Sequence, residues 1–337
     1  MIERQQERQT IAILGAGSWG TALAIHLART GHDVRLWGRD ADLVQRMMAA
    51  RENATYLPQV PLPPAVHVTA DLADGVASAS MLVVAVPSHG LRATIVKAQP
   101  DLPAGIPIVS TVKGIEQGTL LRMSDVVRQE AGDGHPVAVL SGPSFASEFA
   151  RQLPTVVSVA CADAAVAARV QAEFRGPTLR LYVTDDVVGV EIGGALKNVI
   201  AIASGAADAL GLGHNALAAL VTRGLAEMSR LACAMGGRRD TLAGLSGLGD
   251  LVLTCTGHLS RNRQVGMELG RGRPLQDVLG GMKMVAEGVR TTSAALALGQ
   301  RHGIELPIAE QMAAVLDGRK APRAAVEELM LRPPRAE

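Results

Sequence analysis

A G-x-G-x-x-G loop near the start of the chain constrains the fold more than any other feature. Gly15, Gly17 and Gly20 lie in GAGSWG, which follows the apolar run 11–14 and precedes the apolar-periodic run 21–29. Strand, glycine turn and helix in this order are the context that a dinucleotide-binding loop requires. The first glycine permits the tight turn, the second lets backbone approach a pyrophosphate, and the third allows close helix packing. A glycine-rich surface turn is the alternative, but it would not require a buried strand upstream.

The apolar pattern predicts two domains. Up to about residue 184, short apolar runs alternate with helical stretches, as in a parallel sheet covered by helices. After residue 185, alanine- and leucine-rich stretches punctuated by glycines replace the β-branched runs. We therefore predict a doubly wound, Rossmann-type α/β domain over residues 1–185, an all-helical domain over 186–331 and a frayed tail over 332–337.

Individual elements of the first domain follow from the same pattern. Four prolines between residues 53 and 64 predict an irregular loop there. The expected helices are residues 40–50, 91–99, 120–131 and 164–174. The expected strands are residues 11–14, 33–37, 81–86, 107–112, 137–140, 155–161 and 179–183.

The charge balance argues against a nucleic-acid partner. Lys and Arg number 33 and Asp and Glu 32, so the net charge of +1 creates no field that would attract a polyanion. Aromatic residues make up 2% of the chain and offer few surfaces for stacking bases. The longest apolar window, 187–212, is interrupted by Glu191, Lys197 and Asp208, which favours a buried helix over a membrane span.

The cysteines and the N-terminus indicate a cytoplasmic location. Cys161, Cys233 and Cys255 are widely spaced and include no C-x-x-C pair, which suits a reducing compartment and small packing residues, and predicts no metal site. The first ten residues are polar and charged, unlike a signal peptide.

The end of the second expected strand bears on cofactor choice. An acidic residue at this point binds the ribose hydroxyls of NAD, whereas an arginine accepts the 2′-phosphate of NADP. Arg39 occupies the position and favours NADP, but Asp40 follows it directly. A solvated loop arginine is the alternative for Arg39, so NADP and NAD both stay open.

Lys197 is the strongest catalytic candidate. It lies in the apolar helical stretch 190–204, where burial would lower its pKa and allow proton exchange near neutral pH. The alternative is a lysine that extends to solvent from a buried helix. Asn198 is adjacent, and small neighbours on the same helical face would leave space for a ligand. Those neighbours are Gly193, Gly194, Ala201 and Ser204.

Polar residues elsewhere complete a candidate site. Lys113 and His89 follow expected strands, at the sheet edge where ligands bind. A cation at Lys113 could polarise a carbonyl, while His89 could simply be exposed. Asp250 lies four residues before Thr254 on one helical face and could orient Lys197 or merely cap the helix. The stretch 260–263, SRNR, opens another helix and could bind phosphate.

Together these motifs resemble the bacterial NAD(P)-dependent sn-glycerol-3-phosphate dehydrogenases. The similarity runs from about Ile11 to about Leu331, with motifs of both domains in family order. It implies hydride transfer that interconverts dihydroxyacetone phosphate and sn-glycerol 3-phosphate, chiefly to supply phospholipid backbones. The motifs are GAGSWGTALA, HDVRLWGRD, NATYLPQVPLP, VPSH, STVKGIE, LSGPSFASE, GGALKNVIAIASG, NALAALVTRGLAEMSRL, GLSGLGDLVLTCTGHLSRNRQVG and VAEGVRTT.

The resemblance also implies roles for particular residues. Lys197 of GGALKN would be the proton acceptor, and Asn198 with Lys113 would help to polarise the substrate oxygen. The implied substrate contacts are Lys113, Gly142, Ser144, Asp250, Ser260, Arg261 and Asn262. The implied cofactor contacts are Ser18, Trp19, Arg39, Lys113, Ala146, Arg261, Val285 and Glu287. In relatives the residue at position 39 varies, and Trp19 replaces a tyrosine or phenylalanine that packs on the cofactor.

Two other classes share parts of this pattern. The 3-hydroxyacid dehydrogenases and ketopantoate reductases also join a glycine-loop domain to a helical domain with a lysine, but they prefer a carboxylate to a phosphate ester. A cofactor-sensing protein without turnover would need none of Lys113, Lys197, Asp250 and Arg261. The expected partner is a small phosphate substrate, and a homodimer is an expectation only.

Overall fold

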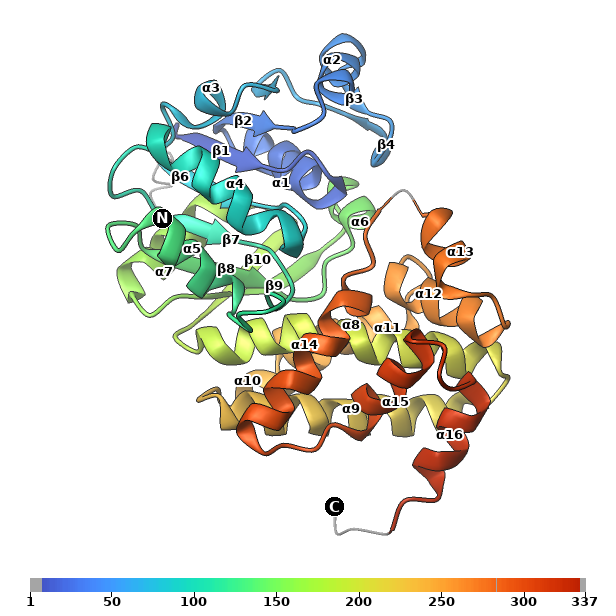
Figure 1. Ribbon diagram of the computed structural model, residues 1–337. Coiled ribbons are helices and arrows are strands. Elements are labelled where there is room, and N and C mark those ends of the chain that lie inside the picture. Colours follow the sequence, from blue (N-terminus) through green and yellow to red (C-terminus); the bar gives the residue numbers. More distant parts are fainter. Residues whose placement is uncertain (1–7, 283, 334–337) are drawn as a thin grey trace. The chain divides into compact units, whose positions relative to one another are not determined.

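The computed structural model describes residues 8–282 and 284–333, and these form two compact units (Figure 1). The sheet unit comprises residues 8–112 and 123–187, and the helical unit comprises residues 113–122 and 188–333. The expected boundary near residue 185 thus lies close to the last crossing at Val187. Lys113–Arg122 was expected in the first domain but groups with the helical unit. Of the expected frayed tail, residues 334–337 lie outside the described part.

The sheet unit is doubly wound. Its sheet has the order β10-β9-β8-β7-β6-β1-β2-β5 within the described residues. The chain winds outward from β1 through β2 to β5 and then returns to β6 on the other side of β1, so the sheet has its switch point between β1 and β6. The strands are β1 (Thr10–Leu14), β2 (Asp33–Trp37), β5 (Val66–Thr69), β6 (Met81–Val84), β7 (Ile108–Ser110), β8 (Val137–Ser141), β9 (Thr155–Ala160) and β10 (Leu179–Thr184).

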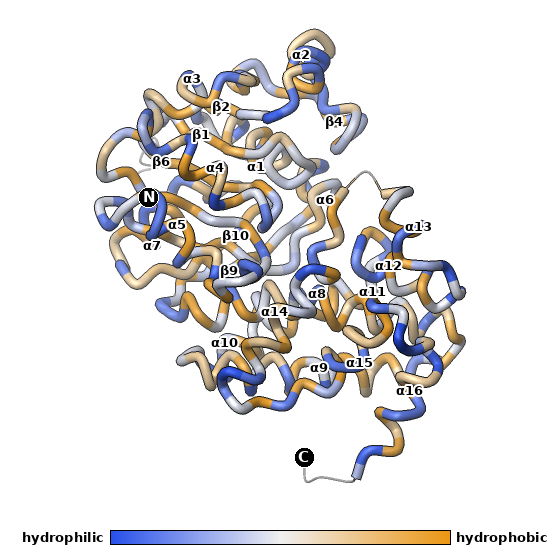
Figure 2. Tube along the Cα trace, in the orientation of Figure 1, coloured by the Kyte–Doolittle hydropathy of each residue, from blue (hydrophilic) through white to orange (hydrophobic). Residues whose placement is uncertain are grey.

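Pairing in this sheet is parallel except between β8 and β9. The connection between these two strands contains only the short helix α6 (Ala146–Ala150), which is too little for a crossover, so the chain turns back antiparallel. The other helices of the unit are α1 (Ser18–Arg29), α2 (Ala41–Ala50), α3 (Leu72–Val76), α4 (Leu91–Ala98), α5 (Met123–Ala131) and α7 (Ala164–Phe174). In Figure 2 hydrophobic residues follow the strands, whereas hydrophilic residues cover much of α2.

The proline-rich segment is a β-hairpin, so the expected irregular loop was wrong. Strands β3 (Glu52–Asn53) and β4 (Leu57–Pro61) pair antiparallel as a separate two-stranded sheet. A two-stranded ribbon consists of edge strands only, where proline is tolerated, and Pro58 and Pro61 are exposed. Leu57 and Val60 are buried in the core of the sheet unit.

The helical unit is built around α8 (Val187–Ala209). By length and composition α8 could cross a membrane, but 94% of its most apolar window is buried, which is typical of a core helix. Of the cysteines, Cys161 and Cys255 are buried as expected, but Cys233 is exposed. The other helices of the unit are α9 (Gly213–Ala234), α10 (Arg239–Ala243), α11 (Asp250–Thr256), α12 (Arg261–Gly270), α13 (Leu275–Gly280), α14 (Glu287–His302), α15 (Pro307–Leu316) and α16 (Pro322–Met330).

Glycines allow α12 and α14 to approach α8 closely. A Cβ on Gly205 would lie 1.9 Å from the Arg263 carbonyl oxygen, and a Cβ on Gly266 would lie 1.9 Å from the Ile202 carbonyl oxygen. On α14, a Cβ on Gly288 would lie 2.5 Å from the Asn198 carbonyl oxygen. Backbone therefore packs on backbone at these crossings, which fixes the position of α8.

Candidate active site

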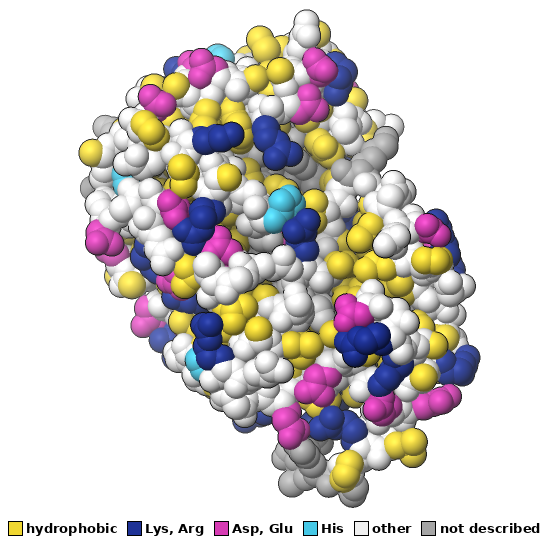
Figure 3. All heavy atoms as spheres, in the orientation of Figure 1, with side chains coloured by type: hydrophobic (Ala, Val, Ile, Leu, Met, Phe, Trp, Pro, Cys, Tyr) yellow, Lys and Arg dark blue, Asp and Glu magenta, His cyan; other side chains and the backbone are white. Residues whose placement is uncertain are grey.

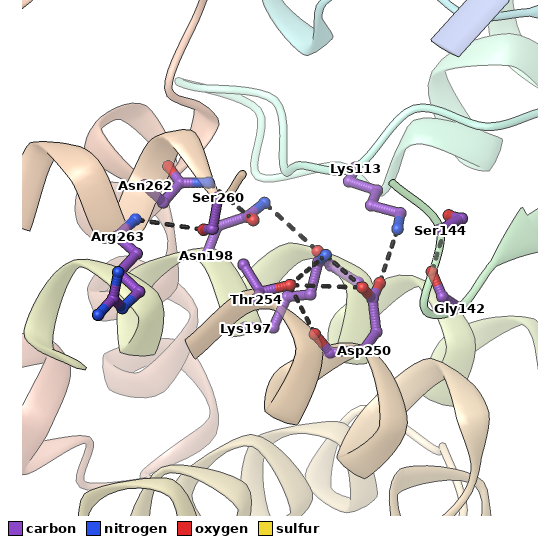
Figure 4. A network of polar contacts seen from close by, with 11 residues as sticks. Lys113, Gly142, Ser144, Lys197, Asn198, Asp250, Thr254, Ser260, Asn262 and Arg263 are labelled. Atoms are coloured by element: carbon purple, nitrogen blue, oxygen red, sulfur yellow. Dashed lines mark hydrogen bonds and ion pairs between the residues drawn. The ribbon is translucent and has the colours of Figure 1, made fainter. Parts of the chain in front are cut away.

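One carboxylate joins two lysines inside the helical unit (Figure 4). The side chains of Lys197 on α8 and Lys113 both point toward Asp250 at the start of α11. Lys197 Nζ donates to Asp250 Oδ1 at 2.5 Å, and Lys113 Nζ donates to Asp250 Oδ2 at 2.6 Å. Asp250 is 1% exposed. Its side chain thus binds both lysines, which is the arrangement that the orienting alternative expects.

Thr254 completes the cluster, and we had not predicted it as a site residue. Its hydroxyl accepts from Lys197 Nζ at 2.8 Å and donates to the Asp250 carbonyl oxygen at 2.5 Å. The four-residue spacing from Asp250 was the signal, because it places both side chains on the same face of α11. Two of the three hydrogens of a protonated Lys197 therefore have partners, and none for the third lies among the described residues.

Burial lowers the pKa of the Lys197 ammonium from 10.5 to about 8. Loss of hydration is the largest cause; the Asp250 carboxylate raises this pKa, and the nearby Lys113 charge lowers it. The Lys197 side chain is 8% exposed, so it does not extend into solvent. A lysine in this state can exchange a proton near neutral pH.

Two of the small residues around Lys197 serve packing inside the protein, which corrects the expectation that they leave space for a ligand. A Cβ on Gly193 would lie 2.7 Å from the Ser246 carbonyl oxygen, so protein rather than ligand fills this position. Ser246 belongs to η3 (Leu245–Gly249), a π-helical turn that leads directly into Asp250. The Ser204 hydroxyl is also engaged and donates to the Cys255 carbonyl oxygen at 3.1 Å.

The segment Lys113–Arg122 brings Lys113 to this cluster. Ile115 is 3% exposed and lies in the core of the helical unit, and it forms a β-bridge with Arg122. Arg122 Nη1 forms an ion pair with Glu191 Oε2 of α8 at 3.0 Å, and Glu191 is buried. The N-terminal part of α8 therefore anchors the segment that begins at Lys113 through Arg122, at the other end of the segment.

A second polar cluster lies at the N-terminus of α12. Ser260 caps the helix, since its hydroxyl accepts from Arg263 N at 3.2 Å. Asn262 Nδ2 donates to Asn198 Oδ1 at 2.9 Å, and Asn262 Oδ1 accepts from Gly288 N at 2.9 Å. These bonds tie α12 to α8 and α14, so the predicted substrate residues Asn198 and Asn262 also have structural partners.

Arg261 opens α12 and reaches the segment before α14. Its Nη1 donates to the Val285 carbonyl oxygen at 2.8 Å, and burial lowers the pKa of its guanidinium while the Glu287 charge opposes this. Arg261, Val285 and Glu287, all predicted cofactor residues, thus lie close together. A partly buried guanidinium beside a helix N-terminus is suited to bind an anion.

The glycine loop of the sheet unit lies at the switch point between β1 and β6. Gly15 has φ +119°, and a Cβ there would lie 2.6 Å from the Ala85 carbonyl oxygen, while a Cβ on Gly20 would lie 2.0 Å from the Gly15 carbonyl oxygen. A Cβ on Gly17 would meet nothing within 4 Å. The fold thus requires Gly15 and Gly20, whereas the space at Gly17 is open, as a loop that receives a pyrophosphate needs.

Other predicted residues of the sheet unit are placed as follows. Ser18 and Trp19 begin α1, and the Trp19 ring packs on Phe149 with centroids 5.3 Å apart. Arg39 is exposed, and the Asp40 side chain caps α2 by accepting from Asp42 N and Leu43 N. The Ser144 hydroxyl donates to the Gly142 carbonyl oxygen at 2.9 Å, Ala146 begins α6, and His89 is exposed.

Among the described residues, His, Cys, Asp and Glu side chains do not gather as a metal site would require. No group of three or more His, Cys, Asp or Glu side chains that could hold a metal ion occurs among them. On the face that Figure 3 shows, basic and acidic side chains of the described residues are intermixed.

A doubly wound sheet with a G-x-G-x-x-G loop and a helical unit with a buried lysine–carboxylate pair define an NAD(P)-dependent dehydrogenase. Residues 10–167 match the family described as "NAD-dependent glycerol-3-phosphate dehydrogenase N-terminus", and residues 186–327 match the corresponding C-terminus. The chain belongs to the NAD-dependent glycerol-3-phosphate dehydrogenase family. It is an oxidoreductase that uses NAD or NADP.

Individual relatives agree over nearly the whole chain. The glycerol-3-phosphate dehydrogenase [NAD(P)+] of Acidobacterium capsulatum is 53% identical, over 97% of this chain and 99% of the relative. The glycerol-3-phosphate dehydrogenase [NAD(P)+] of Myxococcus xanthus is 52% identical, over 97% of this chain and 98% of the relative. The crystal structure of the Coxiella burnetii enzyme is similar with a TM-score of 0.93 and 43% identity, over 96% of this chain and 99% of that one. These matches decide against the carboxylate-specific dehydrogenases.

Proposed function

We propose that this protein interconverts dihydroxyacetone phosphate and sn-glycerol 3-phosphate, with Lys197 as the proton donor and acceptor. The observation that carries the proposal is the buried Lys197 ammonium, whose pKa is about 8 and which is held by Asp250 and Thr254. The nicotinamide cofactor, when bound, supplies or accepts the hydride at C2 of the substrate.

Proton transfer follows from the lysine cluster. In reduction, protonated Lys197 uses its third hydrogen to protonate the ketone oxygen, and in oxidation the neutral amine takes the proton back. Asp250 holds Lys197 in place, and Lys113, with Asn198, helps to polarise the oxygen. Asp250 therefore interacts with the positive charges of both Lys113 and Lys197, and the charge of Lys197 is lost and regained during the reaction.

We propose that the start of α12 binds the substrate phosphate. Ser260, Arg261 and Asn262 combine a hydroxyl, a partly buried guanidinium and helix N–H groups. Gly142 and Ser144 belong to the same proposal by family resemblance. Binding energy at the phosphate, remote from C2, would orient the reacting carbon.

We propose that the sheet unit binds the cofactor through Gly15, Gly17, Ser18, Trp19 and Gly20, with NADP preferred. The support for NADP is that the Asp40 carboxylate is used as the cap of α2, while the Arg39 side chain is exposed and has no hydrogen-bond partner in the described part of the chain. The remaining cofactor residues proposed by resemblance are Lys113, Ala146, Arg261, Val285 and Glu287.

Two variants test the site assignments, with dihydroxyacetone phosphate reduction as the assay. Lys197→Ala should lower turnover by about 10²- to 10⁴-fold while cofactor affinity is nearly kept. Arg261→Ala should chiefly raise the KM for the phosphate substrate. Arg263→Ala is the matched control, because Arg263 lies on α12 as well but forms its ion pair with Asp208 of α8. Substantial turnover in Lys197→Ala, or equal KM values in the two arginine variants, would contradict the assignments.

Cofactor preference is tested separately. Arg39→Asp should weaken NADPH binding more than NADH binding, because it removes the cation and adds a carboxylate. An unchanged preference for NADPH would remove the role assigned to Arg39.

We further propose a cytoplasmic enzyme, acting as a homodimer, whose product supplies glycerophospholipid synthesis. Expression in a bacterium that lacks its own enzyme should restore growth without added glycerol, whereas Lys197→Ala should not. Sedimentation of the purified protein tests the dimer. Absence of rescue by an active enzyme would refute the metabolic role.

A further inference from the structure

Asn53 in the β3–β4 hairpin is a fully buried amide that holds the glycine loop. Its side chain is 0% exposed, and its Nδ2 donates to the Ala16 carbonyl oxygen at 2.9 Å and to Thr21 Oγ1 at 2.8 Å. Its Oδ1 accepts from Tyr56 N at 3.1 Å. One hydrogen of the amide is thus used on Ala16 in the glycine loop and the other on Thr21 in α1, directly after the loop, while the amide oxygen is used within the hairpin.

The bond to Ala16 fixes the orientation of a peptide group inside the G-x-G sequence. The Ala16 carbonyl and the Gly17 N–H belong to one planar trans peptide, in which the two bonds point in opposite directions. Asn53 draws the Ala16 oxygen inward, so the Gly17 N–H points the other way. Neither this N–H nor a Cβ placed on Gly17 meets a protein partner within the described residues.

The chemistry of the contact selects asparagine. The Ala16 oxygen can only accept a hydrogen bond, and the Tyr56 N–H can only donate one, so position 53 needs a donor and an acceptor on one short side chain. An aspartate would place a carboxylate oxygen against the Ala16 carbonyl. Leucine or alanine would leave the carbonyl buried without a partner, which is costly.

We propose that Asn53 is a positioning residue for cofactor binding, which holds the Gly17 N–H in the direction where it donates to the pyrophosphate. The inference rests on the proposed role of the glycine loop. Asn53 also makes the order of this loop depend on the hairpin, because Asn53 is held by Tyr56 N and the hairpin is held in the core by the buried Leu57 and Val60.

The test measures dissociation constants of NADPH, NADH and ADP-ribose for the purified full chain. All three probes contain the pyrophosphate, so Asn53→Asp should weaken each by a similar factor, about tenfold to hundredfold. The KM for dihydroxyacetone phosphate at saturating cofactor should change less than about twofold, because the proposed role of Asn53 concerns the cofactor pyrophosphate and not the substrate. Glu52→Ala is the matched control, because Glu52 Oε1 accepts from Gln59 N at 2.8 Å in the same hairpin without touching the loop.

The outcomes distinguish this inference from the proposal that the glycine loop binds the cofactor. If Asn53→Asp binds all three probes like the wild type, or weakens them no more than Glu52→Ala does, the role of Asn53 is refuted. If Gly17→Ala also leaves all three unchanged, the loop itself is not the pyrophosphate site and both proposals fail.

A second variant covers the case in which Asn53→Asp does not fold. Thr21→Val keeps the shape of the side chain but removes one of the two bonds to Nδ2, and it should raise all three dissociation constants by a smaller common factor. Amide hydrogen exchange of residues 15–20 should speed up in Thr21→Val and not in Glu52→Ala. Equal exchange and equal affinities in these two variants would overturn the inference.

Discussion

The sharpest prediction concerns the pH dependence of the two reaction directions. With a pKa of about 8, about 9% of Lys197 is neutral at pH 7, whereas a lysine with a pKa of 10.5 is about 0.03% neutral, a difference of about 300-fold. Reduction needs the protonated amine and oxidation needs the neutral one. Oxidation should therefore rise about tenfold from pH 6 to 7 and level off above pH 9, and reduction should fall about tenfold from pH 9 to 10.

The assay is single-turnover kinetics in both directions from pH 6 to 10 at constant ionic strength. The two profiles should bend near the same pH, one rising and one falling. Lys197→Met should remove both bends along with most of the rate. A bend near 10.5, or one near 8 that persists in Lys197→Met, would refute the assignment of the proton to this lysine.

The neighbours of Lys197 supply an internal check on the cause of its pKa. Lys113 lowers this pKa and Asp250 raises it, so Lys113→Met should move both profiles to higher pH and Asp250→Asn should move both to lower pH. Arg263→Ala changes a charge outside the cluster and should move neither. Shifts in the same direction for Lys113→Met and Asp250→Asn would contradict this electrostatic account.

Three further predictions concern stability and the loop. Gly17→Ala should weaken NADPH binding with little change in melting temperature, whereas Gly15→Ala should lower the melting temperature itself. Of these two glycines, Gly15 has the positive φ and lacks space for a Cβ. Equal losses of melting temperature in the two variants would contradict this difference. Glu227, whose pKa burial raises to about 7 from 4.5, stays protonated in the folded state where the unfolded state loses its proton, so stability should fall between these pH values. Urea unfolding should show that Glu227→Gln removes up to about 3 kcal/mol of this loss, and a parallel pH profile would refute it. Gly205→Ala should lower the free energy of unfolding by more than about 3 kcal/mol, because its Cβ would overlap backbone of α12; a loss below about 1 kcal/mol would show that the helices can separate freely.

Local sequence signals predicted the parts of the protein that depend on neighbours in the chain. The glycine loop between a strand and a helix, and an apolar helix interrupted by Lys197, were both readable because each motif carries its own context. Asp250 and Thr254 were placed on one face by their spacing, but only the folded helical unit shows that Thr254 reaches the Lys197 amine.

Signals that depend on tertiary packing were not readable. The prolines after Asn53 indicated a loop because proline is rare in the central strands of a larger sheet. The sequence does not show that this segment forms a separate two-stranded ribbon, in which both strands are edge strands. Gly193 suggested space for a ligand, since the sequence does not show that the Ser246 carbonyl fills it. The grouping of Lys113–Arg122 with the helical unit depends on Ile115 finding a distant core, which no local pattern encodes.

The segment Lys113–Arg122 has a consequence for how such proteins can be recombined. The chain passes between the two units after Val112, after Arg122 and again after Val187, so a single cut at the last crossing does not separate two self-sufficient modules. A chimera joined there would combine one parent's Lys113 and Ile115 with the other parent's carboxylate and helical core. Exchange among relatives should therefore succeed only when this short insert travels with the C-terminal half, as a single inherited block.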